Sequence, residues 1–200
     1  MGATERDEWL RAPWRVIVAG AVDPRRLVFV DEMGTNTSLS ALYAYAPKRR
    51  SAYARIPRNR GANTTLLASM SLEGMGPCLA VEGATTAPVF ETYVEKVLAP
   101  SLRRGQIIVL DNLSAHKSER AKELIEERGC QILYLPVYSS PDFNPIEEAF
   151  SKIKGALRKA QARTREALIE ALGVAISAVT TRDAHCFFEH GGYHLPVHLL

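Results

Sequence analysis

Two short apolar segments, each closed by an aspartate, most constrain the fold of this 200-residue chain. Residues 27–30 read Leu-Val-Phe-Val and lead into Asp31, and residues 107–110 read Ile-Ile-Val-Leu and lead into Asp111. Because every position in these runs is apolar, the pattern predicts buried parallel strands that are covered on both faces. Neighbouring strands lie about 5 Å apart, so side-by-side strands would bring both carboxylates to one edge of the sheet.

A third carboxylate, Glu147, follows a predicted helix start. Asn144 is suited to be the N-cap of this helix and Pro145 to be its first helical residue. Carboxylates held close together repel one another unless a cation lies between them. Asp31, Asp111 and Glu147 therefore predict a shared divalent-metal site at the edge of the sheet.

The helix face that carries Glu147 continues with cations. Lys154 and Arg158 lie in line with Glu147 at helical spacing. This layout is expected if a phosphodiester lies over the metal and its flanking phosphates run along the helix. The core-facing stripe beside it contains four apolar residues: Ile146, Phe150, Ile153 and Leu157.

Each of the three carboxylates also has a purely structural alternative. Glu147 occupies the third helical position, where a glutamate often closes a capping box. An aspartate at the end of a strand commonly caps a loop. The neighbouring acids Glu32 and Glu148 are interpreted as structural, because Glu32 should lie on the opposite face of its strand from Asp31 and Glu148 points off the Glu147 face.

Basic residues gather in two segments that contain no acid, although the net charge is only +3. Such clusters on a balanced chain suit binding to a phosphate backbone. A solvated loop and a solvated helix face are the alternatives. Tyr43, Tyr45 and Tyr53 interleave with the first segment and could stack on bases, although packing is the commoner use. The clusters are Lys48, Arg49, Arg50, Arg55, Arg58 and Arg60, and Lys152, Lys154, Arg158, Lys159, Arg163 and Arg165.

The composition excludes several classes of protein. No segment approaches the ~18 consecutive apolar residues of a membrane span, and the charged N-terminus is unlike a signal peptide. We therefore expect a cytoplasmic protein with no membrane partner. The three cysteines form no CxxC pair, which fits a reducing cytosol. The chain lacks both the phosphate loop of ATPases and the GxSxG motif of acyl hydrolases.

The order of the predicted elements indicates an α/β fold. Antiparallel strands come first and β-α-β units follow, which predicts a mixed sheet with helices on its faces. Glycines and a proline argue against a continuous helix over residues 186–198, and so against a zinc site formed by the cysteine and histidines there. The predicted strands cover residues 27–32, 41–46, 64–72, 77–83, 106–111 and 131–136, and the predicted helices cover 5–20, 87–102, 118–128, 145–160 and 164–179.

Three of these segments together resemble the catalytic half of DDE transposases. They are residues 30–32 (Val-Asp-Glu), residues 109–117 (Val-Leu-Asp-Asn-Leu-Ser-Ala-His-Lys) and residues 140–154 (Ser-Pro-Asp-Phe-Asn-Pro-Ile-Glu-Glu-Ala-Phe-Ser-Lys-Ile-Lys). The similarity is to bacterial insertion-sequence members of the mariner-like superfamily. It divides the chain into a connector helix region at 1–25, a DDE catalytic domain at 26–192 and a tail at 193–200.

The resemblance implies a ribonuclease-H-like fold, with a mixed sheet of three antiparallel strands followed by two parallel ones and helices on both faces. It implies two Mg²⁺ or Mn²⁺ ions, with Asp31 bridging both and Asp111 and Glu147 each holding one. The implied reaction is metal-dependent DNA cleavage and strand transfer during transposition of an insertion sequence. The residues expected to bind DNA are Lys48, Arg49, Arg50, Arg58, Arg60, His116, Lys117, Lys154 and Arg158.

The resemblance also implies partners. They are DNA, as element ends and target, a second copy of the chain, and an upstream-frame chain carrying the family's helix-turn-helix, all at the bacterial nucleoid. The chain departs from the family in its spacing of 36 positions between Asp111 and Glu147, one more than usual. Two alternatives stay open: a nuclease of the same fold without strand transfer, and a non-catalytic remnant that binds DNA or a partner subunit. For His116, a role in the turn is also open.

Overall fold

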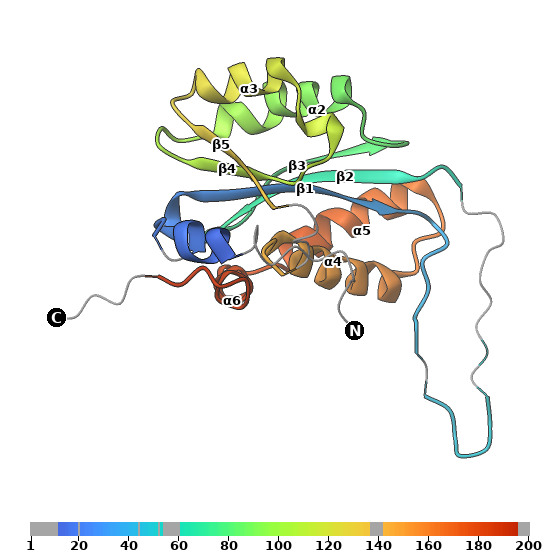
Figure 1. The fold of residues 1–200 in the computed structure, drawn as a ribbon. Helices are drawn as coiled ribbons and strands as arrows, with labels where there is room; N and C mark the ends of the chain where they lie inside the picture. The colour runs from blue at the N-terminus through green and yellow to red at the C-terminus, as the bar shows by residue number, and fades with distance from the viewer. Residues whose placement is uncertain are drawn as a thin grey trace.

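In a computed structural model, a five-stranded mixed sheet forms the centre of the chain (Figure 1). The structure describes residues 12–19, 21–43, 45–51, 53, 61–136 and 142–195. The strand order is β3-β2-β1-β4-β5, in which β1, β2 and β3 are antiparallel neighbours and β4 and β5 run parallel to β1. This confirms the predicted sheet. The strands are β1 (Leu27–Thr35), β2 (Thr64–Ser71), β3 (Gly74–Glu82), β4 (Ile107–Leu110) and β5 (Gln131–Tyr134).

Helices cover both faces of the sheet. Figure 1 shows α2 and α3 on one face and α4, α5 and α6 on the other. Within the described part of the chain, no helix is long and apolar enough to cross a membrane. The helices are α2 (Ala87–Tyr93), continued by η3 (Val94–Leu98) and η4 (Ala99–Ser101), α3 (Glu119–Glu126), α4 (Ile146–Ala160), α5 (Arg165–Ser177) and α6 (Thr181–His190).

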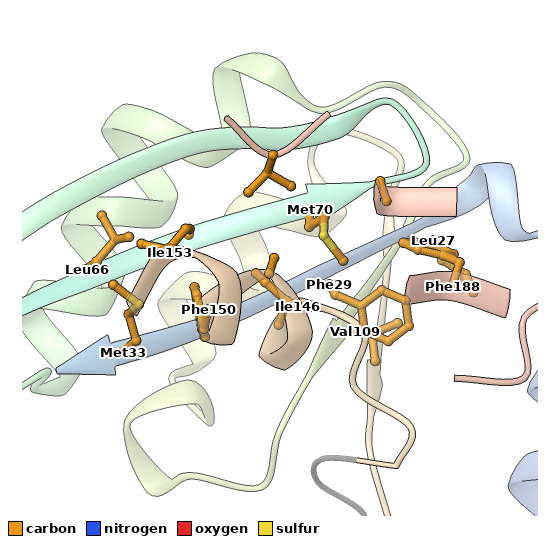
Figure 2. Close-up of a cluster of buried hydrophobic side chains, with 14 of the residues drawn as sticks. Leu27, Phe29, Met33, Leu66, Met70, Val109, Ile146, Phe150, Ile153 and Phe188 are labelled. Atoms are coloured by element: carbon orange, nitrogen blue, oxygen red, sulfur yellow. The ribbon is translucent and has the colours of Figure 1, made fainter. Parts of the chain in front are cut away.

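The central strand β1 divides the apolar core into two layers. Its side chains alternate between the faces, so Phe29 packs with α4 and α6 while Val28 and Val30 pack with α2 and α3. Figure 2 shows Phe29 among side chains of the first layer, and its ring meets Phe188 of α6 edge to face at 5.3 Å. Burial on both faces explains why the β1 run is apolar at every position up to Asp31.

The two ends of the described chain meet in the first layer. The indole Nε1 of Trp14, in η1 (Trp14–Ala19), donates a hydrogen bond to the Tyr193 hydroxyl at 3.0 Å. That hydroxyl donates in turn to the carbonyl of Phe143 at 2.7 Å. Trp14 belongs to the predicted connector region and Tyr193 to the predicted tail, yet both side chains are buried in the core.

The prediction of a strand at residues 41–46 is wrong. The described residues of this segment form no strand, and Leu42, Tyr43 and Tyr45 are exposed. The aromatic side chains there favour an extended chain, but β1 already has β2 on one side and β4 on the other, so no sheet edge is free beside it. Propensity alone does not create a strand without a partner.

Helix α6 was not predicted from the sequence. A capping box between Thr180 and Asp183 starts it, and Ala184 and Phe188 form its buried stripe. The helix ends at Gly191. The expectation that no helix continues through the glycines is therefore confirmed for the described residues, whereas the ten-residue helix before them went unnoticed.

Pairing between β1 and β4 ends just before the site. The ladder joins residues 27–29 to residues 107–109 and stops at Phe29 and Val109, two positions short of Asp31 and Asp111. On its other side, β1 stays paired with β2 as far as Thr35. Side chains rather than backbone hydrogen bonds must therefore connect β1 to the end of β4 at the site.

Candidate active site

Asp31 lies in the middle of β1 rather than at the strand end that was predicted, because β1 stays paired with β2 as far as Thr35, and only 7% of Asp31 is exposed. Its Oδ1 accepts a hydrogen bond from the backbone N–H of Glu32 at 2.7 Å, and its Oδ2 accepts one from the side-chain amide of Asn144 at 2.7 Å. Asn144 was expected to cap α4, but the cap residue is Pro145 and no side chain caps this helix end. The expectation was wrong because the side-chain N–H of Asn144 donates to Asp31, and Oδ1, the atom that would cap the helix, has no hydrogen-bond partner among the described residues.

Asp111 follows directly after β4 and its side chain is about one-third exposed. Its Oδ1 accepts a hydrogen bond from the backbone N–H of Leu113 at 2.9 Å and lies 2.6 Å from Nδ1 of His116. The His116 side chain is fully buried, and its Nε2 lies 2.9 Å from Oε2 of Glu32, an ion-pair distance without the alignment of a regular hydrogen bond. A chain of contacts thus runs from Asp111 through His116 to Glu32.

Glu147 lies in the first turn of α4 and is partly buried. Its backbone N–H donates to the carbonyl of Asn144 at 3.1 Å, so the residue that binds Asp31 also starts the turn that carries Glu147. Because the cap residue is Pro145, Glu147 occupies the second helical position rather than the third, where the glutamate of a capping box lies. Asn144 therefore links two of the three predicted carboxylates.

The electrostatics show that Asp31 senses the charges of the other two carboxylates. Burial raises the pKa of Asp31 to about 7, the charges of Glu147, Asp111 and Glu32 add to the rise, and the Glu32 N–H opposes it. Burial alone would raise the pKa of Asp111, but the bonds from His116 and Leu113 outweigh it and lower the pKa. Negative charge is therefore concentrated around Asp31.

His116 responds in the opposite sense to its burial. Desolvation lowers the pKa of a buried histidine, but the carboxylates of Asp111 and Glu32 overcome that effect and raise the pKa of His116 to about 9. Near neutral pH the ring is therefore a cation held between two anions.

The donor set fits a hard divalent cation in its chemistry. Carboxylate oxygens are the ligands that Mg²⁺ prefers, and a cation would relieve the mutual repulsion that helps to raise the pKa of Asp31. Within the described ranges, no group of three His, Cys, Asp or Glu side chains is already arranged to hold a metal ion. Instead, one oxygen of Asp31 is bound to Asn144.

The structure separates the residues that were expected to bind DNA into three groups. Lys48, Arg49, Arg50 and Lys117 are exposed, and the charge of Lys117 helps to lower the pKa of Asp111. Lys154 and Arg158 are partly buried on α4. His116 is fully buried, so its side chain is not available to a phosphate. Arg58 and Arg60 lie outside the described residues.

The sequence-based reasoning missed the roles of two site residues, Glu32 and Asn144. Glu32 does point to the opposite face from Asp31, as predicted, but it meets His116 there. Asn144 binds Asp31 rather than the helix end. The alternation along β1 could have indicated the contact between Glu32 and His116, because it places Glu32 on the face of the sheet that is covered by α2 and α3, where His116 lies. Nothing local indicated the contact between Asn144 and Asp31, which joins residues 113 positions apart.

A mixed sheet of this order, with carboxylates from β1, the end of β4 and a later helix, defines a ribonuclease-H-like domain. Residues 26–169 match the model of the DDE superfamily endonuclease family. That match covers most of the chain, so the chain belongs to the DDE superfamily endonucleases. A comparison with curated proteins finds no match.

Solved structures of the Mos1 mariner transposase share the fold. The chain in a pre-cleavage Mos1 transpososome gives a TM-score of 0.69 at 16% identity, over 92% of this chain and 58% of that one. A Mos1 paired-end complex with Mg gives 0.72 at 15% identity, over 98% and 66%. The Mos1 catalytic domain gives 0.57 at 16% identity, over 94% and 91%. The chain thus spans 58% of the transposase chain in the transpososome.

Proposed function

We propose that the chain is the catalytic part of a DNA transposase that cleaves DNA and joins strands with the help of divalent metal ions. The observation that carries the proposal is the setting of Asp31. It is buried, and the carboxylates of Asp111 and Glu147 help to raise its pKa to about 7. A fold has no structural need for that concentration of charge, whereas a cation-dependent reaction does.

Asp31, Asp111 and Glu147 are the residues that would hold the ions. When bound, Mg²⁺ or Mn²⁺ supplies a nucleophile from water or a 3′-hydroxyl and stabilises the leaving oxygen. Asn144 holds Asp31 beside the start of α4, and His116 holds Asp111 after β4. These contacts keep the carboxylates of Asp31 and Asp111 oriented although the pairing between β1 and β4 has ended at Phe29 and Val109.

Three cations near the carboxylates suit the proposed DNA path. Lys117 lies beside Asp111, and Lys154 and Arg158 follow Glu147 along α4. Contacts of this kind to phosphates position a duplex without reading its sequence. Recognition of element ends would then require a helix-turn-helix on another segment or partner chain.

We extend the proposal to a homodimer that pairs two DNA ends. Solved Mos1 assemblies include paired-end complexes and a strand transfer complex. In the present chain, the described residues after β1 run away from the sheet (Figure 1) and expose Tyr43, Tyr45 and Tyr53. Large exposed aromatic side chains are typical of interaction surfaces.

The test uses supercoiled plasmid DNA with Mn²⁺, for the wild type and for Asp111→Asn. Metal-dependent nicking that is lost in Asp111→Asn is the expected result. Nicking that persists in the variant overturns the metal-site assignment. A folded wild type that binds plasmid without nicking it favours the remnant.

A second assay separates a transposase from a simple nuclease of the same fold. A labelled duplex with a free 3′-hydroxyl end is incubated with plasmid target, Mn²⁺ and the protein. Covalent joining of the label to the plasmid is expected for a transposase. Nicking without joining favours the nuclease.

A further inference from the structure

A buried histidine follows β4 and precedes α3 in the chain, and it lies on the face of the sheet opposite to Asp31. His116 is the last residue of the short helix η5 (Ser114–His116). Its ring packs against Phe90 of α2 with the ring centroids 4.5 Å apart, and its carbonyl accepts a hydrogen bond from the Tyr134 hydroxyl at 3.2 Å. Contacts on the ring and the backbone together hold the imidazole in place.

Each ring nitrogen of His116 faces a carboxylate. Nδ1 lies 2.6 Å from Oδ1 of Asp111, and Nε2 lies 2.9 Å from Oε2 of Glu32. The same Oδ1 of Asp111 accepts the backbone N–H of Leu113 at 2.9 Å. Two donors from different directions on one oxygen restrict the rotation of the Asp111 carboxylate.

The imidazole bridges a point where the sheet no longer connects its strands. The ladder between β1 and β4 stops at Phe29 and Val109. Glu32 lies three positions beyond Phe29, the last residue of β1 that pairs with β4, although it still pairs with β2, and Asp111 lies beyond the last paired residue of β4. His116 therefore joins β1 to the end of β4 in place of backbone hydrogen bonds.

We propose that His116 and Glu32 form a positioning dyad, in which Glu32 anchors the imidazole and the imidazole orients Asp111 toward the metal. The inference rests on the proposed function, because it assumes that Asp111 is a metal ligand. Carboxylates that bind metals are themselves oriented by hydrogen bonds, and loss of such a partner costs about 10–100-fold in metal affinity or activity. The dyad assigns His116 to positioning rather than to phosphate contact.

The sign of the effect separates positioning from simple electrostatics. Removal of His116 takes no negative charge from the site, so electrostatics alone would leave Mn²⁺ binding unchanged or tighter. Loss of positioning weakens it. His116→Ala should raise the Mn²⁺ concentration for half-saturation about tenfold or more. His116→Asn, whose amide can donate near the position of Nδ1, should restore most of the affinity.

Two variants of Glu32 separate the contact of its side chain with Nε2 from its charge. Glu32→Gln loses the charge but keeps an oxygen that can accept from Nε2, and Glu32→Ala loses both. We expect Glu32→Ala to weaken Mn²⁺ binding by about tenfold and Glu32→Gln to weaken it clearly less. Equal effects would show that only the charge of Glu32 matters and would overturn its role as an anchor.

The experiment measures Mn²⁺ binding to the DNA-free protein by the electron paramagnetic resonance signal of free Mn²⁺, alongside plasmid nicking against Mn²⁺ concentration. Leu98→Ala, in the same apolar layer as Phe90, is the control for lost stability and should lower Tm without changing Mn²⁺ binding. Wild-type binding in a folded His116→Ala protein overturns the dyad. If that variant does not fold, wild-type binding by Glu32→Ala overturns it.

Asp111→Asn distinguishes failure of the dyad from failure of the proposed function. If Asp111→Asn abolishes binding and nicking while the His116 and Glu32 variants match the wild type, only the dyad is wrong. If Asp111→Asn itself binds Mn²⁺ and nicks like the wild type, the proposed function is wrong.

Discussion

Asp31 in β1 and Asp111 after β4 are the same residue type in opposite electrostatic settings. Asp31 is buried beside the neutral amide of Asn144, and its pKa is raised to about 7. Asp111 is half-buried beside the imidazole of His116, and its pKa is lowered. Each carboxylate accepts two hydrogen bonds, so the number of bonds does not explain the difference. The charge of the partner and the depth of burial do.

This difference suggests a division of roles within one site. Asp111 is ionised over the whole physiological range, because the protonated imidazole of His116 contacts it in the folded protein and lowers its pKa. Asp31 has no such partner among the described residues, so a bound divalent cation would be the group that favours its ionised form. Of the two aspartates, Asp31 is therefore the one that lacks a positively charged partner until a cation binds.

The largest expected effect treats the two aspartates alike. Asp31→Asn and Asp111→Asn should each reduce plasmid nicking by more than about 100-fold, because each removes a proposed metal ligand. Nicking is measured with Mn²⁺ at pH 8. Glu148→Gln is the matched control, since Glu148 is the next residue after Glu147 and pairs with the exposed His190. A loss of similar size in the control would point to general damage at α4.

The second prediction sets the two aspartates apart. Without metal at pH 8, Asp31→Asn should raise the free energy of unfolding by about 2–4 kcal/mol, because it removes a buried charge whose pKa is raised. Asp111→Asn should lower it by about 1–2 kcal/mol, because it leaves His116 with one carboxylate and Asp111 is only partly shielded from solvent. Tm of both variants, read from thermal unfolding, checks the signs.

The stability gain from Asp31→Asn should depend on pH. Because the folded-state pKa of Asp31 is raised, its contribution to stability is fully present below about pH 4 and is lost as the pH rises to about 7. The gain from Asp31→Asn should therefore vanish at pH 4. His116, with its pKa raised to about 9, contributes stability below pH 6.5 that is lost as the pH rises through 9. A gain from Asp31→Asn that is equal at pH 4 and pH 8 would contradict the assignment.

The third prediction concerns metal addition. A cation that binds only the folded protein stabilises it by about 2.7 kcal/mol at 100 times its Kd, and for a chain of this size each kcal/mol raises Tm by about 2–4 °C. The rise with Mn²⁺ should be larger at pH 8 than at pH 5.5, because Asp31 must lose a proton to bind the ion. Neither Asp31→Asn nor Asp111→Asn should show it. Ca²⁺ addition at equal ionic strength serves as the comparison for ion size.

The positions of the two aspartates in the fold could largely be predicted from the sequence. The uninterrupted apolar runs before Asp31 and Asp111 require burial on both faces, which in turn requires central strands. The helix start after Asn144 was also visible, from the proline and the apolar spacing that follows it. Patterns with a short period determine such features, so a single sequence carries them.

The partners of the aspartates could not be predicted, because long-range packing selects them. His116 is buried because its segment folds back against Phe90, 26 positions earlier in the chain. Asn144 reaches Asp31 across 113 positions. A local pattern would equally allow a histidine in a solvated turn and an asparagine at a helix cap. The point where the ladder between β1 and β4 stops depends on the same tertiary contacts.

The smallest expected effect isolates the neutral partner of Asp31. Asn144→Ala should lower the free energy of unfolding by about 2 kcal/mol at pH 9, where Asp31 is ionised, and by about 1 kcal/mol at pH 5, because a hydrogen bond to a charged group is worth more than one to a neutral group. Asn112→Ala is the matched control. The Asn112 amide donates to the carbonyl of Leu135, which does not titrate, so its cost should not change with pH. Urea unfolding of both variants at the two pH values gives the four free energies, and equal costs for Asn144→Ala at both would mean that its amide does not sense the charge of Asp31.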